Sequence, residues 1–282
     1  MIPDRFSNVS SLIRPRVSLA VAAGSLFGAL YHGHLYGGSD HAWTAAAGAF
    51  LLCAGCSALN QVQERERDAR MERTRTRPLA SGRMKPAGGV LWAGLFGLAG
   101  LALFFWAGGW PTLLAGLGVV AVYNGLYTPL KRVSPMALLA GGVAGAAPPL
   151  TGWLAAGGRL LEPHILGVAV IFYLWQVPHF WLLAEKHRED YARAGFAVLH
   201  VGLSPVFRAR LMGVWVAAYF VGLGCFAGMA GPASLRCIVL PALLLAGGTA
   251  AWLAATNRHR PALAAMHLSL PLGLAPLLFS TI

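Results

Sequence analysis

Long apolar segments recur along the whole chain, and they constrain its fold more than any other feature. Hydrophobic residues make up 57% of the sequence and charged residues only 11%, against about 25% charged in soluble domains. A helix needs about 20 apolar residues to cross a bilayer. The sequence therefore predicts an all-α, polytopic membrane protein that forms one membrane-embedded domain over residues 1–282. Its nine predicted spans lie near 17–37, 43–60, 89–107, 110–127, 135–157, 163–183, 208–229, 234–255 and 262–281.

The basic residues are distributed unevenly between the two ends of these spans. When the N-terminus and every second loop are assigned to one face, all Lys and Arg residues except Arg159 and Arg236 fall on it. Cytoplasmic loops carry such an excess. We therefore predict a bacterial inner-membrane protein in a lipid bilayer, with a cytoplasmic N-terminus and an external C-terminus. Because topology accounts for the net charge of +12, we expect no nucleic-acid partner.

The segment at 60–85, NQVQERERDARMERTRTRPLASGRMK, carries eight basic and four acidic residues between two apolar runs. Asn60, Glu64 and Asp68 are spaced i, i+4 and i+8, so they share one face if the preceding helix continues past its apolar part. Oxygen ligands of this kind suit Mg²⁺ that bridges to substrate phosphates. The arginines that follow match phosphate oxygens with bidentate contacts. They are Arg65, Arg73, Arg75 and Arg77.

This first charged segment has two interpretations. Carboxylates, a divalent cation and arginines together indicate a diphosphate site, in the cytoplasmic loop at 61–88. The alternative is a solvated loop whose arginines only determine membrane topology.

A second charged cluster, WQVPHFWLLAEKHREDYARAG at 175–195, has the same plan of an apolar helix that runs into acids and bases. Lys186 and Asp190 are i, i+4 neighbours in the predicted cytoplasmic loop at 184–207. Between the two clusters, Tyr127 and Lys131 are also four residues apart. These residues suggest two halves that close on one cavity. The alternatives are a surface helix with salt bridges and, for Lys131, an ordinary residue of a cytoplasmic loop.

Several motifs resemble, in the order in which they occur, those of the UbiA superfamily of intramembrane prenyltransferases, whose first motif is Asn-x-x-x-Asp-x-x-x-Asp. They resemble more narrowly its protoheme IX farnesyltransferase branch, the heme O synthases. The resemblance covers residues from about 60 to 200. It rests on M-x-R-T-x-x-R-P-L at 71–79, YTPLKR at 127–132, AGAAPPLTGW at 144–153, WQVPHFW at 175–181 and DYARAG at 190–195.

The chain departs from the family pattern at a few positions. Glu64 and Glu66 stand where the family usually has aspartate, and Arg67 stands where it usually has an apolar residue. After DYARAG the family usually continues with a segment containing two prolines, whereas residues 196–200 read FAVLH and contain none.

The resemblance implies a UbiA-type helical bundle and a specific reaction. Its substrates would be farnesyl diphosphate and heme b, and a hydroxyethylfarnesyl group would form at a heme vinyl group. Heme A synthase or a terminal oxidase assembly is the implied recipient of the product. Mg²⁺ would be held, in catalysis, by Asn60, Glu64, Asp68 and Asp190. Diphosphate would be bound by Arg65, Arg73, Arg77, Tyr127, Lys131 and Lys186.

His179 lies in an apolar helix, where its imidazole either meets heme or packs through a hydrogen bond. We expect the heme role from the family motif around it. Three other functions remain open from the residues. They are a UbiA-type enzyme for an aromatic or quinone precursor, a carrier and a heme-binding assembly protein without catalysis. A carrier would place ionisable groups near the bilayer midplane, whereas here they gather at helix ends.

Overall fold

The computed structural model describes residues 2–197, 203–230, 233–256 and 258–278, and within these ranges the regular elements are all helices. The predicted all-α class is therefore confirmed for this part of the chain. The first half contains α1 (Ile2–Ile13), α2 (Pro15–Tyr36), α3 (Ala42–Asp68), α4 (Pro86–Val120), a π-helix η1 (Ala121–Tyr127), α5 (Thr128–Leu130) and α6 (Ala137–Ala155). The second half contains α7 (Pro163–Lys186), α8 (Arg188–Arg193), α9 (Pro205–Ala230), α10 (Ala233–Ala255), α11 (His259–Leu274) and a 3₁₀ helix η2 (Ala275–Leu278).

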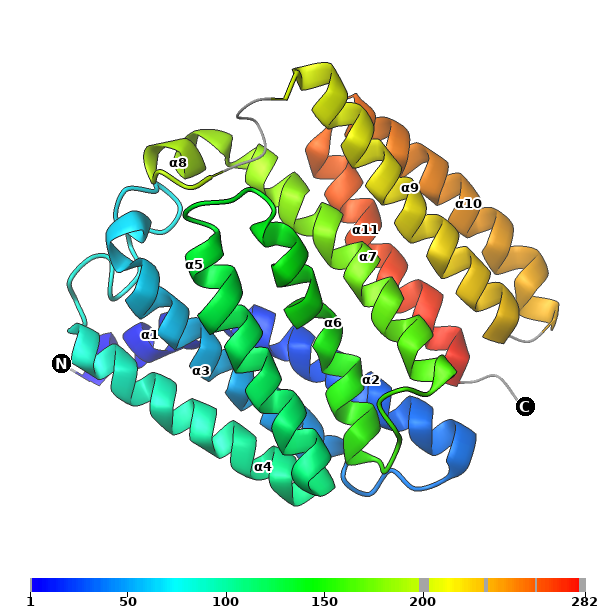
Figure 1. Ribbon diagram of the computed structural model, residues 1–282, viewed down its shortest axis with the longest axis horizontal. Coiled ribbons are helices and arrows are strands. Elements are labelled where there is room, and N and C mark those ends of the chain that lie inside the picture. The colour runs from blue at the N-terminus through cyan, green and yellow to red at the C-terminus, as the bar shows by residue number, and fades with distance from the viewer. Residues whose placement is uncertain (1, 198–202, 231–232, 257, 279–282) are drawn as a thin grey trace.

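Five helical segments of the described chain are long and apolar enough to cross a bilayer. The longest has 45 residues, from Pro86 to Leu130, and would extend about 68 Å if it were straight. That is roughly twice the thickness of a hydrocarbon core. Gly108 and Gly109 have non-helical backbone angles, and Gly109 has a φ of 65°. The segment therefore breaks into two arms there, between the spans predicted at 89–107 and 110–127, and Figure 1 shows the chain reversing at this point.

The helices pack into one bundle in which small residues allow close approach. Gly141 of α6 is one example, because a Cβ there would lie 2.8 Å from the ring of Phe180 and 2.9 Å from the ring of Tyr127. Its missing side chain leaves room for these two rings, whose centroids are 5.6 Å apart with nearly parallel planes. Close approach through glycine is typical of helices in membranes.

The charged connections of the chain gather at one end of this bundle. Figure 1 shows the cyan segment after α3, the green turn after α5 and the yellow-green helix α8 at the same end. The first residues of α9 and α11 lie at that end as well. The segments that the charge pattern assigns to one face are therefore side by side in space.

Candidate active site

Helix α3 continues past its apolar part and ends at Asp68. Asn60, Glu64 and Asp68 are each 4% exposed or less, whereas Arg65 and Glu66 on the opposite side are exposed. The spacing of i, i+4 and i+8 therefore does place the three polar side chains on one inward face, as predicted.

Glu64 is the centre of a buried hydrogen-bonded network. Its Oε1 lies 2.8 Å from Lys131 Nζ, and the same ammonium group donates to Oε2 at 2.9 Å. The amide of Asn60 donates to Glu64 Oε2 at 3.0 Å and to Thr128 Oγ1 at 3.1 Å. Thr128 in turn donates to the carbonyl of Tyr123. The end of α3 is thus tied to α5 through charged and polar groups that are removed from water.

The π-helix η1 brings the YTPLKR motif into this network. A π-helical turn has an i to i+5 hydrogen bond and occurs often at functional sites. It places Asn124 inward, where its amide donates to the carbonyl of Cys56 at 3.1 Å and to Gln63 Oε1 at 3.2 Å. Lys131 follows one turn after Tyr127, and its Nζ lies 4.7 Å from the centroid of that ring. Sequence periodicity carries no signal for such a turn, so the contribution of Asn124 and Thr128 is not predicted.

Asp68 forms a second buried ion pair, with Arg77 at 2.7 Å. Burial lowers the pKa of the Arg77 guanidinium, and the Asp68 carboxylate opposes this shift. The connecting loop is packed against the protein, because Met71 and Thr74 are buried and Thr74 Oγ1 donates to the carbonyl of Asp68 at 2.9 Å. The segment at 69–85 therefore packs on the protein at Met71 and Thr74, while Arg73 and Arg75 remain exposed.

Asp190 connects the second charged cluster to this loop. Its carboxylate accepts the backbone N–H of Glu72 at 3.1 Å and of Arg73 at 3.2 Å, and it pairs with Arg193. Desolvation raises the pKa of Asp190, but these donors outweigh it and hold the pKa below its ordinary value. The second cluster therefore contacts the first through a carboxylate that anchors a backbone turn. That the two halves close on one cavity stays a prediction.

Two of the departures from the family pattern, Arg67 and the segment that begins at Phe196, contact each other. Arg67 Nη1 donates to the carbonyl oxygens of Ala194, at 3.1 Å, and Gly195. Its guanidinium carbon lies 5.1 Å from the centroid of the Phe196 ring, within cation–π range. Lys131 Nζ lies 5.5 Å from the same ring. The Phe196 ring therefore contacts a basic residue from each of two motifs, Arg67 from the first charged segment and Lys131 from YTPLKR. We name the contact between Arg67 and Phe196 the clasp.

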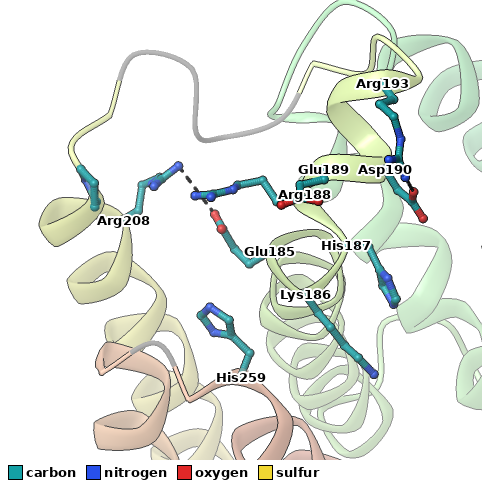
Figure 2. Close-up of a pocket in the computed structure, with 10 residues that line it drawn as sticks. Glu185, Lys186, His187, Arg188, Glu189, Asp190, Arg193, Arg208 and His259 are labelled. Atoms are coloured by element: carbon teal, nitrogen blue, oxygen red, sulfur yellow. Dashed lines mark hydrogen bonds and ion pairs between the residues drawn. The ribbon is translucent and has the colours of Figure 1, made fainter. Parts of the chain in front are cut away.

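The remaining predicted residues lie at the edges of the site. Arg65 is exposed and pairs with its neighbour Glu66 at 2.9 Å, and the Arg73 side chain is also exposed. Tyr127 and Lys131 line a small cavity of about 60 Å³ that α7 closes on its other side. Lys186 lines a different, larger cavity on the side of α7 that faces α9 and α11. Figure 2 shows that the Lys186 side chain is nevertheless directed away from α9 and α11.

His179 has a partner that sequence reasoning missed. Its Nδ1 lies 3.2 Å from Nε2 of His267, on α11, and its ring stacks on Trp175 at 4.6 Å between centroids. Trp175 Nε1 donates to the carbonyl of Met266. In the sequence, His267 is noticeable only as a histidine within the last apolar run. Nothing in the local pattern connects it with His179.

The described residues contain no group of three or more His, Cys, Asp and Glu side chains placed to hold a metal ion. The site nevertheless has hard oxygen donors. Among the described residues the buried Glu64 Oε1 has the Lys131 ammonium, 2.8 Å away, as its ion-pair partner and accepts no further hydrogen bond. An oxygen in this state can take up a cation, so the donor set fits Mg²⁺ if Lys131 and Arg77 move to other anions.

A family model for the UbiA prenyltransferase family matches residues 19–272. The chain therefore belongs to the UbiA prenyltransferase family, and it is a multi-pass membrane protein. A relative from Oleidesulfovibrio alaskensis named protoheme IX farnesyltransferase is 47% identical over 76% of this chain and 75% of its own. A protein of the same name from Geobacter sulfurreducens is 42% identical over 83% of this chain and 87% of its own.

Solved structures agree with this family at the level of the fold. A digeranylgeranylglyceryl phosphate synthase superimposes with a TM-score of 0.74 at 15% identity, over 97% of this chain and 99% of its own. A UbiA homolog from Archaeoglobus fulgidus, bound to GPP and Mg²⁺, superimposes with a TM-score of 0.64 at 16% identity. That match covers 96% of this chain and 99% of the homolog. The bundle is therefore of the UbiA type.

Proposed function

We propose that this protein transfers the farnesyl group of farnesyl diphosphate to a vinyl group of heme b and so makes heme O. The observation that carries this proposal is the 47% identity to a protoheme IX farnesyltransferase over three quarters of the chain. The buried carboxylates and cations at the end of α3 supply groups suited to it. In this reaction the allylic C–O bond breaks and its electron pair leaves with diphosphate. The vinyl carbon attacks the allylic carbon, and water adds to the resulting cation and releases a proton.

The diphosphate end of the site is the cluster around Glu64 and Asp68. Each carboxylate is paired with one cation, Lys131 or Arg77. When diphosphate enters, the two cations can turn to its oxygens, and Asn60 and the freed carboxylates can hold Mg²⁺. The ion stabilises the charge that develops on the leaving group. Asp190 is proposed as the fourth ligand, and Arg65, Arg73, Tyr127 and Lys186 as further diphosphate contacts.

The heme end of the site is proposed at His179. The hydrogen-bonded His267 and the stacked Trp175 hold the imidazole in a fixed orientation, as partners of metal-ligating histidines do. His267 is exposed on α11, so a heme that approaches through the bilayer can reach the pair.

The proposed topology has nine spans in one domain, with a cytoplasmic N-terminus and an external C-terminus, in the bacterial inner membrane. With the break at Gly108 and Gly109, the five apolar segments would supply six crossings, and α2, α10 and α11 are proposed as the others. Reporter fusions after residues 85 and 195 should report cytoplasm, and a fusion after residue 282 should report the outside. A cytoplasmic signal at the C-terminus would contradict the nine-span count.

Incubation of the purified protein with heme b, farnesyl diphosphate and Mg²⁺, followed by mass spectrometry of the pigment, tests the proposed reaction. The expected product has the mass of heme b plus one farnesyl group and one hydroxyl group. Unchanged heme b would refute the proposal. Parallel incubation with an aromatic acid or a quinone precursor tests the other UbiA-type reactions. A heme A synthase or a terminal oxidase assembly is the proposed recipient of the product.

A further inference from the structure

A polar cavity of about 540 Å³ lies at the charged end of the bundle, between α7, α8, α9 and α11. Figure 2 shows Arg208, Arg188 and His259 reaching toward Glu185 from α9, α8 and α11. Lys186 and His187 point away from this group. Neither Glu64 nor Asp68 lines the cavity, although Lys186 and Asp190 of the proposed diphosphate site do. The proposed transfer of diphosphate makes no use of Arg208 or His259.

Arg208 is the residue that needs explanation. It is 8% exposed, and among the described residues its Nε has no hydrogen-bond partner. Its ion-pair partner, the Glu185 carboxylate, lies 3.9 Å from Nη1, beyond hydrogen-bond distance. His259 Nδ1 is likewise buried and unpartnered within the described chain. A buried guanidinium with an unsatisfied donor is costly, and an anion in the cavity beside it would offset part of this cost by balancing its charge.

The side chains around this guanidinium have an excess of one positive charge, which one anionic group would balance. Arg188 and Arg208 carry two positive charges and Glu185 carries one negative charge, so the side chains that converge in Figure 2 have a net charge of about +1. A guanidinium fork matches the planar, bidentate geometry of a carboxylate. The cavity therefore suits a monoanionic carboxylate better than a diphosphate, whose higher charge Glu185 would repel.

We infer that this cavity binds a propionate carboxylate of heme b, with Arg208 as the main contact and Arg188 and His259 beside it. This inference rests on the proposed function, because heme b is the substrate that carries such a group. A heme is amphiphilic, with ionised propionates on one edge of an apolar ring. It is therefore expected to lie at a membrane surface, with this edge toward water.

The position of the cavity relative to the histidine pair agrees with this orientation. His259 and His267 are two turns apart on α11, about 12 Å along the helix axis. The cavity is at the charged end of the bundle, and His267 lies deeper on an apolar helix. A heme held by its propionate at Arg208 thus has its ring directed toward His179 and His267, and away from the aqueous end.

Titration of the purified protein with heme b and with its dimethyl ester, followed by absorption spectroscopy, tests the inference. The ester keeps the ring, the iron and the vinyl groups but lacks the carboxylates. Wild-type protein should bind heme b roughly ten- to a hundredfold more tightly than the ester, because a charge-assisted contact is lost. Arg208→Gln should reduce heme b affinity by a similar factor and leave ester affinity and the Michaelis constant for farnesyl diphosphate unchanged.

Two further variants separate binding from misfolding. Arg210→Gln removes the same charge from an exposed position two residues along α9 and should change neither affinity. Glu185→Gln removes the repelling carboxylate and should tighten heme b binding several-fold, a change that a folding defect cannot produce. Equal loss of heme b and ester in Arg208→Gln would overturn the inference, as would a selective change for farnesyl diphosphate.

The product assay on wild-type protein keeps the two proposals distinguishable. Heme O formation without discrimination between heme b and its ester would refute the carboxylate site and leave the reaction intact. Discrimination without heme O formation would refute the reaction and leave the carboxylate site in place.

Discussion

The two charged clusters have the same plan in sequence, but the structure uses them differently. At the end of α3, Asp68 and Glu64 are buried and lie 2.7 and 2.8 Å from their cations. At the end of α7, Glu185 and Arg208 are equally buried but lie 3.9 Å apart, beside a large cavity. The carboxylates at the end of α3 are closed by their own counterions, whereas the part of the second cluster around Glu185 is open.

This difference shows that the density of charged residues in a sequence does not indicate whether each buried charge finds a partner within the protein. Opposite charges stay paired in a protein interior when each gains hydrogen bonds that offset its desolvation. Glu64 has such support from Asn60, and Asp68 from Arg77. Arg208 lacks a hydrogen bond at Nε within the described chain. We therefore expect the first cluster to be sensitive to loss of a partner and the second to gain from an external anion.

The largest effect is expected for Asp68→Asn in the closed cluster. Activity should fall by roughly a hundredfold or more, because an amide neither neutralises Mg²⁺ nor pairs with Arg77. Loss of one partner from a buried pair also costs about 3–5 kcal/mol of unfolding free energy. Heme O formation and thermal unfolding in detergent measure the two losses. Glu66→Gln is the matched control, since that side chain is 75% exposed, and full activity in Asp68→Asn would contradict the metal site.

Asp190→Asn should have the next largest effect, because it weakens the link between the two clusters. The amide loses the charge that attracts two backbone N–H groups and Arg193, worth about 1.5–3 kcal/mol. Tryptic cleavage within 69–85 should become faster than in wild type. Because the folded-state pKa of Asp190 lies below its ordinary value of 3.8, its stabilisation is present at neutral pH and is lost as the pH falls through the folded-state pKa. Equal cleavage rates in Asp190→Asn and Glu189→Gln would contradict this link.

Glu64→Asp should have a smaller effect than either change. The carboxylate is kept and restores the residue that the family usually has, so activity should stay within about tenfold of wild type, or ~1.4 kcal/mol. Glu64→Gln should lose activity, because it removes the charge that Lys131 faces. Steady-state rates at saturating Mg²⁺ compare the two. Loss of activity in Glu64→Asp comparable to that in Glu64→Gln would mean that arm length, and not charge, decides this position.

The smallest effect is expected at the clasp. In a double-mutant cycle with Arg67→Gln and Phe196→Leu, the coupling energy should be about 0.5–1 kcal/mol. Unfolding of the four proteins in detergent gives this energy. A coupling near zero would mean that Arg67 and Phe196 contribute to stability independently. The hydrogen bonds from Arg67 to the carbonyls of Ala194 and Gly195 would then be what joins the two loops.

Local periodicity is what the sequence determined most securely. The apolar runs predict the helices, and the break at Gly108 and Gly109 follows from residues that leave helical geometry. The inward face of Asn60, Glu64 and Asp68 follows from helix spacing alone, because it depends only on 3.6 residues per turn. The gathering of the charged segments at one end follows from alternation of the loops across a membrane.

Only the tertiary structure decided which partner each charged group has. Lys131 pairs with Glu64 because a π-helical turn carries α5 toward α3, and sequence periodicity contains no signal for that turn. Asp190 anchors the backbone of Glu72 and Arg73 from more than one hundred residues away. His267 meets His179 through the packing of α11 on α7. The physical reason is that helix formation is local, whereas the pairing of buried charges depends on which helices pack together.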